Sequence, residues 1–278
     1  MLRDITIGQY YPAESRVHEL DPRVKIAAVF IYLISLFVFS SFIGYVVVTV
    51  FLVAAIIKSK VPFSYILKGL KPILFLLLFT AVFNIFGTKG DVLFEYKFIT
   101  ITWQGLRKGA FMSMRLIYLI LGSSLLTYTT TPNQLTDGLE TMLKPLEKIK
   151  VPVHDFAMMM SLALRFIPIL LDEANRIISA QSSRGADFDE GNLLHRMKMM
   201  VSILVPLLVS ATRRAYDLAM AMESRCYHGG DGRTKMKPLK YKKTDKIMYG
   251  VVVGYLAVVI VVTLSLIHIS EPTRQAEI

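Results

Sequence analysis

Two short segments of this 278-residue chain carry the residue types best suited to recognising another protein. In each, an apolar run entered through a proline ends in a serine and an arginine, giving Ser183-Arg184-Gly185 and Ser224-Arg225-Cys226. A guanidinium offers five donors in a rigid planar fork that fits carboxylates, and small neighbours permit close approach. The pattern predicts two contact points for a partner. Simple helix capping is the alternative, because an arginine in the last turn and a glycine beyond it also end helices.

Residues that would carry catalysis do not form a convincing set. The chain lacks the Gly-x-x-x-x-Gly-Lys-Ser/Thr loop that cradles nucleotide phosphates, and its five histidines do not form the helical pairs that bind zinc. Cys226 and His228 would serve as nucleophile and base only with a third orienting group and a pocket, so a helix end is the plainer interpretation. The single cysteine excludes an internal disulfide and a cysteine metal cage. We expect no catalysis and no bound cofactor or metal.

The composition indicates a membrane protein. Hydrophobic residues make up 54% of the chain and the mean hydropathy is +0.50, which exceeds the range of soluble domains. The net charge of +11 is spread along loops and a central block, which favours a cytoplasmic membrane face over nucleic-acid binding. Residues 1–21 mix acids and bases before any apolar run, so they do not resemble a cleavable signal peptide.

The first apolar region is too long for one span. Residues 26–57 contain no charged side chain over 32 positions, about 48 Å as a helix against a hydrocarbon core of roughly 30 Å. The Ser-Ser-Phe-Ile-Gly break that begins at Ser40 favours a hairpin of two short spans. A single tilted helix is the alternative.

Two further spans are expected before residue 128. The loop 58–71 carries four lysines and no acid, so it is predicted to be cytoplasmic. A third span follows at about 72–88, then an external loop and a fourth span at about 109–128. Arg115 within the fourth span either reaches back to the external interface or pairs inside the helix bundle.

The rest of the chain divides into three parts. Residues 129–246 hold 18 basic and 13 acidic residues and no stretch that we expect to span, so they are predicted to form a helix-rich cytoplasmic block. Residues 247–265 form a last span. Residues 266–278 change composition abruptly and resemble a translated sequencing adaptor; we expect a non-native tail, with an ordinary polar tail as the alternative. The predicted fold is an all-α membrane protein with about five spans and the helical block between spans four and five.

Several long motifs, in order, resemble the transmembrane T component of energy-coupling factor (ECF) importers, a class of ABC transporter. The resemblance extends to about Leu264. It rests on three groups of motifs: Gly8-Gln9-Tyr10 with Ser15, His18 and Leu20-Asp21-Pro22-Arg23-x-Lys25; Ser161-Leu162-Ala163-Leu164-Arg165-Phe166-Ile167-Pro168 with Leu171-Asp172-Glu173; and Arg213-Arg214-Ala215 with Ala221-Met222-Glu223-Ser224-Arg225-Cys226-Tyr227.

This resemblance implies specific partners. In that family two short motifs, commonly Ala-Arg-Gly, end cytoplasmic coupling helices and insert into grooves of two ABC ATPase subunits. Arg184 and Arg225 match the two arginines, and the departures at Ser183, Ser224 and Cys226 keep the flanks small. ATP and magnesium would then lie on the ATPases and not on this chain, which would be a non-catalytic subunit in a prokaryotic cell membrane.

The resemblance also implies a separate substrate-binding S component, of which one or more would be held by the membrane helices and by apolar faces of the coupling helices. ATP-driven closure of the ATPases would move the coupling helices and tilt the S component with its bound vitamin or other micronutrient. The expected sliding surface consists of Met158, Met159, Met160, Leu162 and Leu164. Ordinary helix-to-helix core is the alternative. The Gly-Gln-Tyr opening at Gly8 favours the shared, vitamin-importing type.

Two other functions compete with this one. A polytopic membrane enzyme would use Cys226 or buried carboxylates, but no span holds a second convergent polar cluster. A self-contained secondary transporter typically shows paired repeats with charged or broken helices at mid-membrane. Neither explains the two Ser-Arg helix ends.

Overall fold

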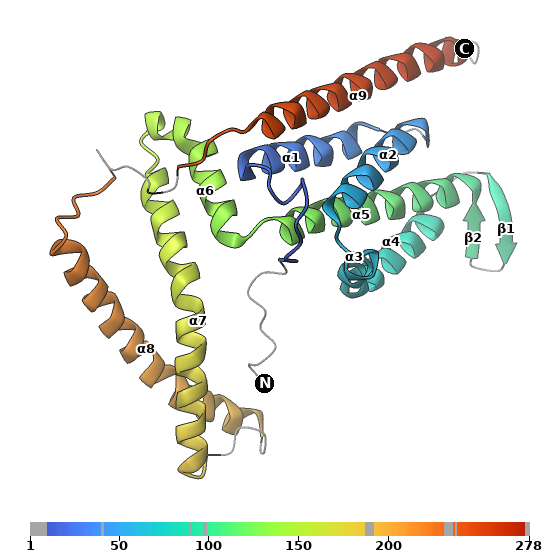
Figure 1. Cartoon of the computed structure of the whole chain (residues 1–278). Coiled ribbons are helices and arrows are strands. Elements are labelled where there is room, and N and C mark those ends of the chain that lie inside the picture. Colours follow the sequence, from blue (N-terminus) through green and yellow to red (C-terminus); the bar gives the residue numbers. More distant parts are fainter. Residues whose placement is uncertain are drawn as a thin grey trace. The chain divides into compact units, whose positions relative to one another are not determined.

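The computed structural model describes residues 10–39, 42–88, 91–96, 99–186, 192–230, 236 and 238–275 (Figure 1). Gly8 and Gln9 of the first motif therefore lie outside the described residues, as do the side chains from 266 onward. The chain forms two compact units. We call residues 8–138 with 239–278 the bundle unit, and the unit built from residues 139–238 the crossed-helix unit.

The bundle unit is helical apart from one β-hairpin. Its elements are α1 (Pro22–Val38), α2 (Phe42–Ser59), α3 (Phe63–Leu70), the 3-10 helix η1 (Lys71–Ile73), α4 (Leu74–Gly87), β1 (Val92–Tyr96), β2 (Ile99–Thr102), α5 (Trp103–Thr129), the first half of α6 (Pro132–Leu143) and α9 (Lys243–Gln275). The strands pair antiparallel with Tyr96 opposite Ile99, and a register shift lies between Val92 and Phe94. The sequence predicted this region only as an external loop.

The prediction of two helices within 26–57 is confirmed. Asp21 caps α1 by accepting a hydrogen bond from the Arg23 N–H at 3.0 Å, and Pro22 occupies the first helical position. α1 stops where Phe39 becomes extended, and α2 begins at Phe42. The lysine-rich segment 58–71, predicted as a loop, contains the short helix α3.

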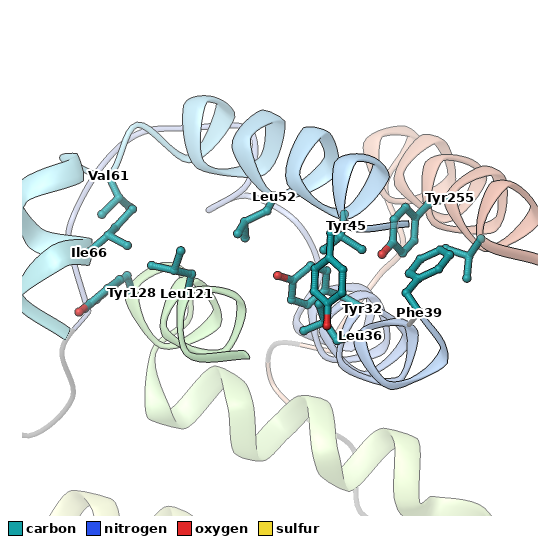
Figure 2. Close-up of a cluster of buried hydrophobic side chains, with 12 residues drawn as sticks. Tyr32, Leu36, Phe39, Tyr45, Leu52, Val61, Ile66, Leu121, Tyr128 and Tyr255 are labelled. Atoms are coloured by element: carbon teal, nitrogen blue, oxygen red, sulfur yellow. The ribbon is translucent and has the colours of Figure 1, made fainter. Parts of the chain in front are cut away.

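The core of the bundle unit joins α1, α2, α3, α5 and α9. Figure 2 shows Tyr32, Leu36, Phe39, Tyr45 and Tyr255 gathered in one group and Val61, Ile66, Leu121 and Tyr128 in another. A polar contact also crosses this core: the hydroxyls of Ser35 in α1 and Tyr255 in α9 lie 2.6 Å apart. Close van der Waals packing of these side chains, together with such hydrogen bonds, holds the helices together.

The outer surface of the bundle unit is strongly apolar. α4 has no buried residue, and Phe75, Leu78 and Phe83 are all more than half exposed. Such a surface requires a covering other than water. By length and composition, five helical segments suffice to cross a membrane: Phe42–Ser59, Trp103–Thr129, Val153–Ser183, Met197–Glu223 and Lys243–Ser265.

Two of these five segments lie within 129–246, where the sequence predicted no span, and they qualify by length and composition. Conversely, α4 has only 14 residues and α1 only 17, because prolines and turns cut both short. The predicted spans thus correspond to helices, but hydropathy alone does not separate them from the helices of the crossed-helix unit.

The crossed-helix unit consists mainly of two long helices. Its elements are the second half of α6, the 3-10 helix η2 (Lys144–Ile149), α7 (Val153–Ser183) and α8 (Leu193–Glu223). α7 and α8 pack against each other and cross (Figure 1). Pro168 and Pro206 lie inside these helices and do not begin them, so the prolines do not mark the entry that the sequence pattern indicated.

Candidate functional site

The first Ser-Arg segment ends α7 in a complete Schellman cap. Ser183 is the last helical residue, Arg184 is the C-cap, and Gly185 follows in the left-handed conformation with φ of 87°. The Gly185 N–H donates to the Ser182 carbonyl and the Ala186 N–H donates to the Gln181 carbonyl, both at 3.0 Å. These two bonds satisfy the last carbonyls of the helix. Capping, the alternative considered for this segment, is therefore a real function of its backbone.

The second segment ends α8 in the same way. Cys226 takes the place of the glycine, with φ of 56°. The Cys226 N–H donates to the Glu223 carbonyl at 2.9 Å, and the Tyr227 N–H donates to the Met222 carbonyl at 3.1 Å. A side chain in this conformation is strained, which costs roughly 1–2 kcal/mol relative to glycine. The two tripeptides thus have one backbone geometry, with an arginine in the same position of each.

Backbone capping leaves the side chains of both arginines unused. Arg184 and Arg225 are exposed, and neither guanidinium has an ion pair or hydrogen bond among the residues that the structure describes. The flanking serines are occupied: Ser183 Oγ donates to the Ser179 carbonyl and Ser224 Oγ to the Ala221 carbonyl, both at 3.0 Å. Within the described residues, each segment therefore presents an exposed arginine without an ion pair, beside a small side chain that hydrogen-bonds to its own helix.

One ion pair joins α7 to α8 where they pack. Arg214 Nη2 donates to Glu173 Oε2 at 3.0 Å, and these side chains are 39% and 26% exposed. The sequence motifs contain both residues, but nothing in them indicates that they pair. Glu173 lies eleven residues before Arg184, and Arg214 lies eleven residues before Arg225. The two helices therefore have equal arms of about 16 Å beyond this contact.

The two arginines lie at opposite ends of the crossed pair. The Tyr227 hydroxyl donates to Met158 Sδ at 3.1 Å, which brings the end of α8 beside the first turns of α7. The helices thus run in opposing directions, as Figure 1 shows. The two similar helix ends therefore lie far apart in this unit, one at each end of the crossed pair.

The predicted sliding surface on α7 divides in two. Met159 and Met160 are more than half exposed. Met158 receives the Tyr227 hydroxyl, and Leu162 and Leu164 are partly buried. A longer exposed apolar stripe, which the sequence reasoning missed, runs along α8 and comprises Met197, Met200, Val201, Leu204, Val205, Leu208 and Val209. Its spacing of three and four residues would have revealed it.

The Asp21-Pro22-Arg23-x-Lys25 motif forms a clasp in the bundle unit. Arg23 donates to both carboxylate oxygens of Asp21, at 3.0 and 2.8 Å, and stacks 3.9 Å above the Tyr241 ring. Although burial opposes it, Arg23 holds the pKa of Asp21 below its usual range. Lys25 Nζ donates to the carbonyl of Thr129, the last residue of α5, at 2.8 Å.

Asp245 completes this clasp from the start of α9. Its carboxylate is 1% exposed and accepts the N–H groups of Asp21 at 2.9 Å and of Lys242 at 2.7 Å. At the point where the chain leaves the bundle unit, Gly138 lies close to α1. A Cβ at this position would come within 2.9 Å of Pro22 Cβ. The motif therefore holds the chain at both points where it passes between the two units. The only sequence signal for Asp245 is a lone acid in a lysine run.

The described part of the chain contains no group of three His, Cys, Asp or Glu side chains that would hold a metal ion. Cys226 is exposed at the end of α8, and His228, two residues on, is exposed as well.

Sequence comparison shows which known proteins this chain resembles. The family model described as cobalt transport protein, CbiQ, matches residues 13–236. A protein of Clostridium kluyveri is 56% identical over 249 residues, covering 89% of this chain and 92% of its own length. A protein of Ruminiclostridium cellulolyticum is 51% identical over 260 residues, covering 94% and 97%, and one of Bacillus subtilis is 45% identical over 246 residues, covering 88% and 93%. All three carry the name energy-coupling factor transporter transmembrane protein EcfT.

Proposed function

We propose a coupling function from the premise that this chain belongs to the CbiQ family and, within it, to the energy-coupling factor transporter transmembrane proteins. In this proposal its crossed-helix unit couples two ABC ATPases to an S component. The chain is the non-catalytic transmembrane subunit of a bacterial transporter and a multi-pass membrane protein. ATP and magnesium belong to the ATPases in this proposal, and the substrate is a vitamin or other micronutrient held by the S component.

The observation that carries the proposal is the pair of matching helix ends. Arg184 and Arg225 share one backbone cap, are exposed, and lie at opposite ends of the crossed helices. Two ATPase subunits of one kind require two similar contact points, and the shared cap gives both arginines the same backbone geometry from which a planar guanidinium can extend. Exposed arginines that become fully desolvated when a partner binds are typical anchors of protein interfaces.

We place α7 and α8 at the cytoplasmic membrane surface and not across the membrane. The longest run without Asp, Glu, Lys or Arg is residues 156–164 in α7 and residues 199–212 in α8. Runs of 9 and 14 residues fall short of the roughly 20 that span a bilayer. The spans are then α1, α2, α4, α5 and α9, and the Lys58 and Lys60 loop lies on the same side as the coupling helices.

The S component is proposed to bind the uncovered apolar faces. The α8 stripe from Met197 to Val209, with Met159 and Met160 of α7, presents flexible and branched side chains whose packing tolerates sliding. Met158, Leu162 and Leu164 contribute at the edge of this surface. Membrane lipid covers the remaining apolar faces of the bundle unit.

Coupling follows from the geometry of the crossed helices. When the ATPases close on ATP, each pulls on one arginine, and the Glu173–Arg214 contact keeps the equal arms together so that both helices rotate about it. The apolar stripe moves with α8, and the S component tilts. The clasp at Asp21 and Asp245 holds the chain where it leaves the membrane helices, so that the motion stays within the crossed-helix unit.

Charge reversal tests this function. In cells expressing the whole transporter, Arg184→Glu with Arg225→Glu is expected to reduce ATPase co-purification at least tenfold and to abolish uptake, while membrane insertion is unchanged. Removing a buried interface charge typically costs 2–5 kcal/mol, which supports that magnitude. The matched control, Arg176→Glu with Lys198→Glu, reverses two exposed charges on the same helices. Equal losses in both variants would refute the docking role.

A further inference from the structure

A basic cavity lies between α4 and α5, on the side of the β-hairpin. It has a volume of about 430 Å³ and is lined by Asn84, Gln104, Arg107, Lys108, Phe111, Met112 and Arg115. On α5 the spacing of Gln104, Lys108, Phe111 and Arg115 places these residues along one helix face. The cavity therefore combines three cations and two side-chain amides with an apolar wall.

No described acidic side chain forms an ion pair with the cations of this cavity. Arg115 is half-buried, and its Nε and Nη2 donate to the Tyr45 hydroxyl and the Phe39 carbonyl, both at 3.1 Å. Both partners are neutral. Of the two alternatives for Arg115, the structure thus shows pairing inside the helix bundle, with partners that carry no charge.

The two exposed cations are equally unbalanced. Arg107 lies 5.7 Å from the centre of the Phe111 ring, and neither Arg107 nor Lys108 has an ion pair with an acid among the described residues. The carboxylate near the rim is that of Asp91, which accepts a hydrogen bond from Gln104 Nε2 at 2.7 Å. Three cations thus converge near the Asp91 carboxylate, which is already hydrogen-bonded. Such a cavity favours an anion as its ligand.

The position of the cavity selects the kind of anion. Trp103 begins α5 and is 55% exposed, as an aromatic anchor at a membrane interface would be. Phe39, whose carbonyl binds Arg115, ends α1 and lies at the turn toward α2. On the neighbouring helix α4 the large exposed residues, such as Phe79 and Phe83, are apolar. The cavity therefore lies where polar headgroups meet acyl chains.

From these observations we infer that the cavity binds the phosphate of an anionic phospholipid headgroup. Arg107 and Lys108 contact the phosphate, Arg115 supplies charge from the cavity wall, and Asn84 and Gln104 donate to headgroup oxygens. Phe111 and Met112 pack against the glycerol and the first acyl carbons. Each basic side chain near an anionic lipid contributes about 1 kcal/mol, so that each is expected to change affinity about fivefold.

Native mass spectrometry of the purified full chain tests this inference. The chain is titrated in detergent with phosphatidylglycerol and, separately, with phosphatidylcholine of the same acyl chains. Wild type is expected to prefer phosphatidylglycerol, and Arg107→Gln with Lys108→Gln is expected to lower that preference about 25-fold. The control, Lys58→Gln with Lys60→Gln, removes two exposed charges elsewhere and is expected to keep it.

Two further arms keep the test decisive. The charge-preserving variant Arg107→Lys with Lys108→Arg is expected to bind like wild type, which excludes loss of folding as the cause. Inorganic phosphate at millimolar concentration is expected not to displace the lipid. An equal preference in wild type and in the Gln variant would overturn the inference, and displacement by inorganic phosphate would reassign the cavity to a free anion and overturn the lipid assignment.

Discussion

Arg214 of α8 donates a 3.0 Å hydrogen bond to Glu173 of α7, and each of these residues lies eleven positions before one of the two exposed arginines. This contact gives the crossed helices equal arms. Burial of apolar surface alone does not require arms of equal length, whereas binding of two similar partners at the two helix ends does.

The crossing contact is expected to matter more for coupling than for stability. Because Arg214 is 39% exposed, solvent screens the pair, and Glu173→Gln should cost only about 0.5–1 kcal/mol of folding free energy. Uptake by the reconstituted transporter should nevertheless fall several-fold relative to ATP hydrolysis. The swapped pair Glu173→Arg with Arg214→Glu should recover part of the uptake. A loss of uptake that merely parallels the loss of folded protein would show that the contact is only structural.

Cys226 is expected to be replaceable by glycine with a gain in stability. Its φ of 56° is left-handed, and at the equivalent position of α7 the chain uses Gly185. Cys226→Gly should therefore raise the unfolding free energy by about 0.5–1 kcal/mol, after allowing for the greater freedom of glycine in the unfolded chain. Thermal unfolding in detergent measures this. Gly185→Ala should destabilise by a similar amount, and an increase in stability with alanine would contradict the capping geometry.

Acidification below neutral pH is expected to destabilise the bundle unit through His18. Burial lowers the pKa of His18 below 6.5, an effect that the hydrogen bond to the Tyr11 carbonyl opposes and the nearby Lys25 reinforces. The neutral ring accepts the Ser15 hydroxyl at Nδ1 and donates to Tyr11 through Nε2. The unfolded chain then binds the proton more readily, so stability falls as the pH drops through 6.5 toward the lower folded pKa. Unfolding midpoints at pH 7.5 and 5.5 should differ in wild type and differ less in His18→Gln.

The clasp predicts graded losses at Asp245. Asp245→Ala leaves the buried N–H of Asp21 and the partly buried N–H of Lys242 without an acceptor and should cost about 2–3 kcal/mol. Asp245→Asn retains one acceptor oxygen and should cost roughly half as much. Denaturant unfolding of the purified chain measures both. Equal stability of the two variants would show that the carboxylate does not hold these groups.

Local features of the fold could be predicted from the sequence. The break in residues 26–57 and the two Ser-Arg helix ends depend on neighbouring residues, so their patterns are legible without a structure. The β-hairpin at Val92–Thr102 was missed, because its strands are short and two-stranded pairing lies close to the limit of stability.

Long-range features could not be predicted in the same way. Asp21 and Asp245 are 224 positions apart, and no spacing rule connects them. Likewise Glu173 and Arg214 pair only because two helices cross. Gly250 and Gly254 lie four residues apart on α9, a spacing typical of helix-packing faces, yet a Cβ at either would meet nothing within 4 Å, so this face is not used by the described part of the chain. By length and composition α7 and α8 also qualify as spans, because a helix at the membrane surface, where we propose that both lie, needs an apolar face as much as a spanning helix does.

Photo-crosslinking from the two helix ends tests the central claim most directly. A photoreactive phenylalanine at Ser183 and, separately, at Ser224 lies beside each arginine, whereas one at Arg176 on α7 is the control. In the assembled transporter both Ser positions are predicted to crosslink to an ATPase subunit, and Arg176 is not. Crosslinks from Ser183 and Ser224 to the S component or to lipid, with none to an ATPase, would contradict the account.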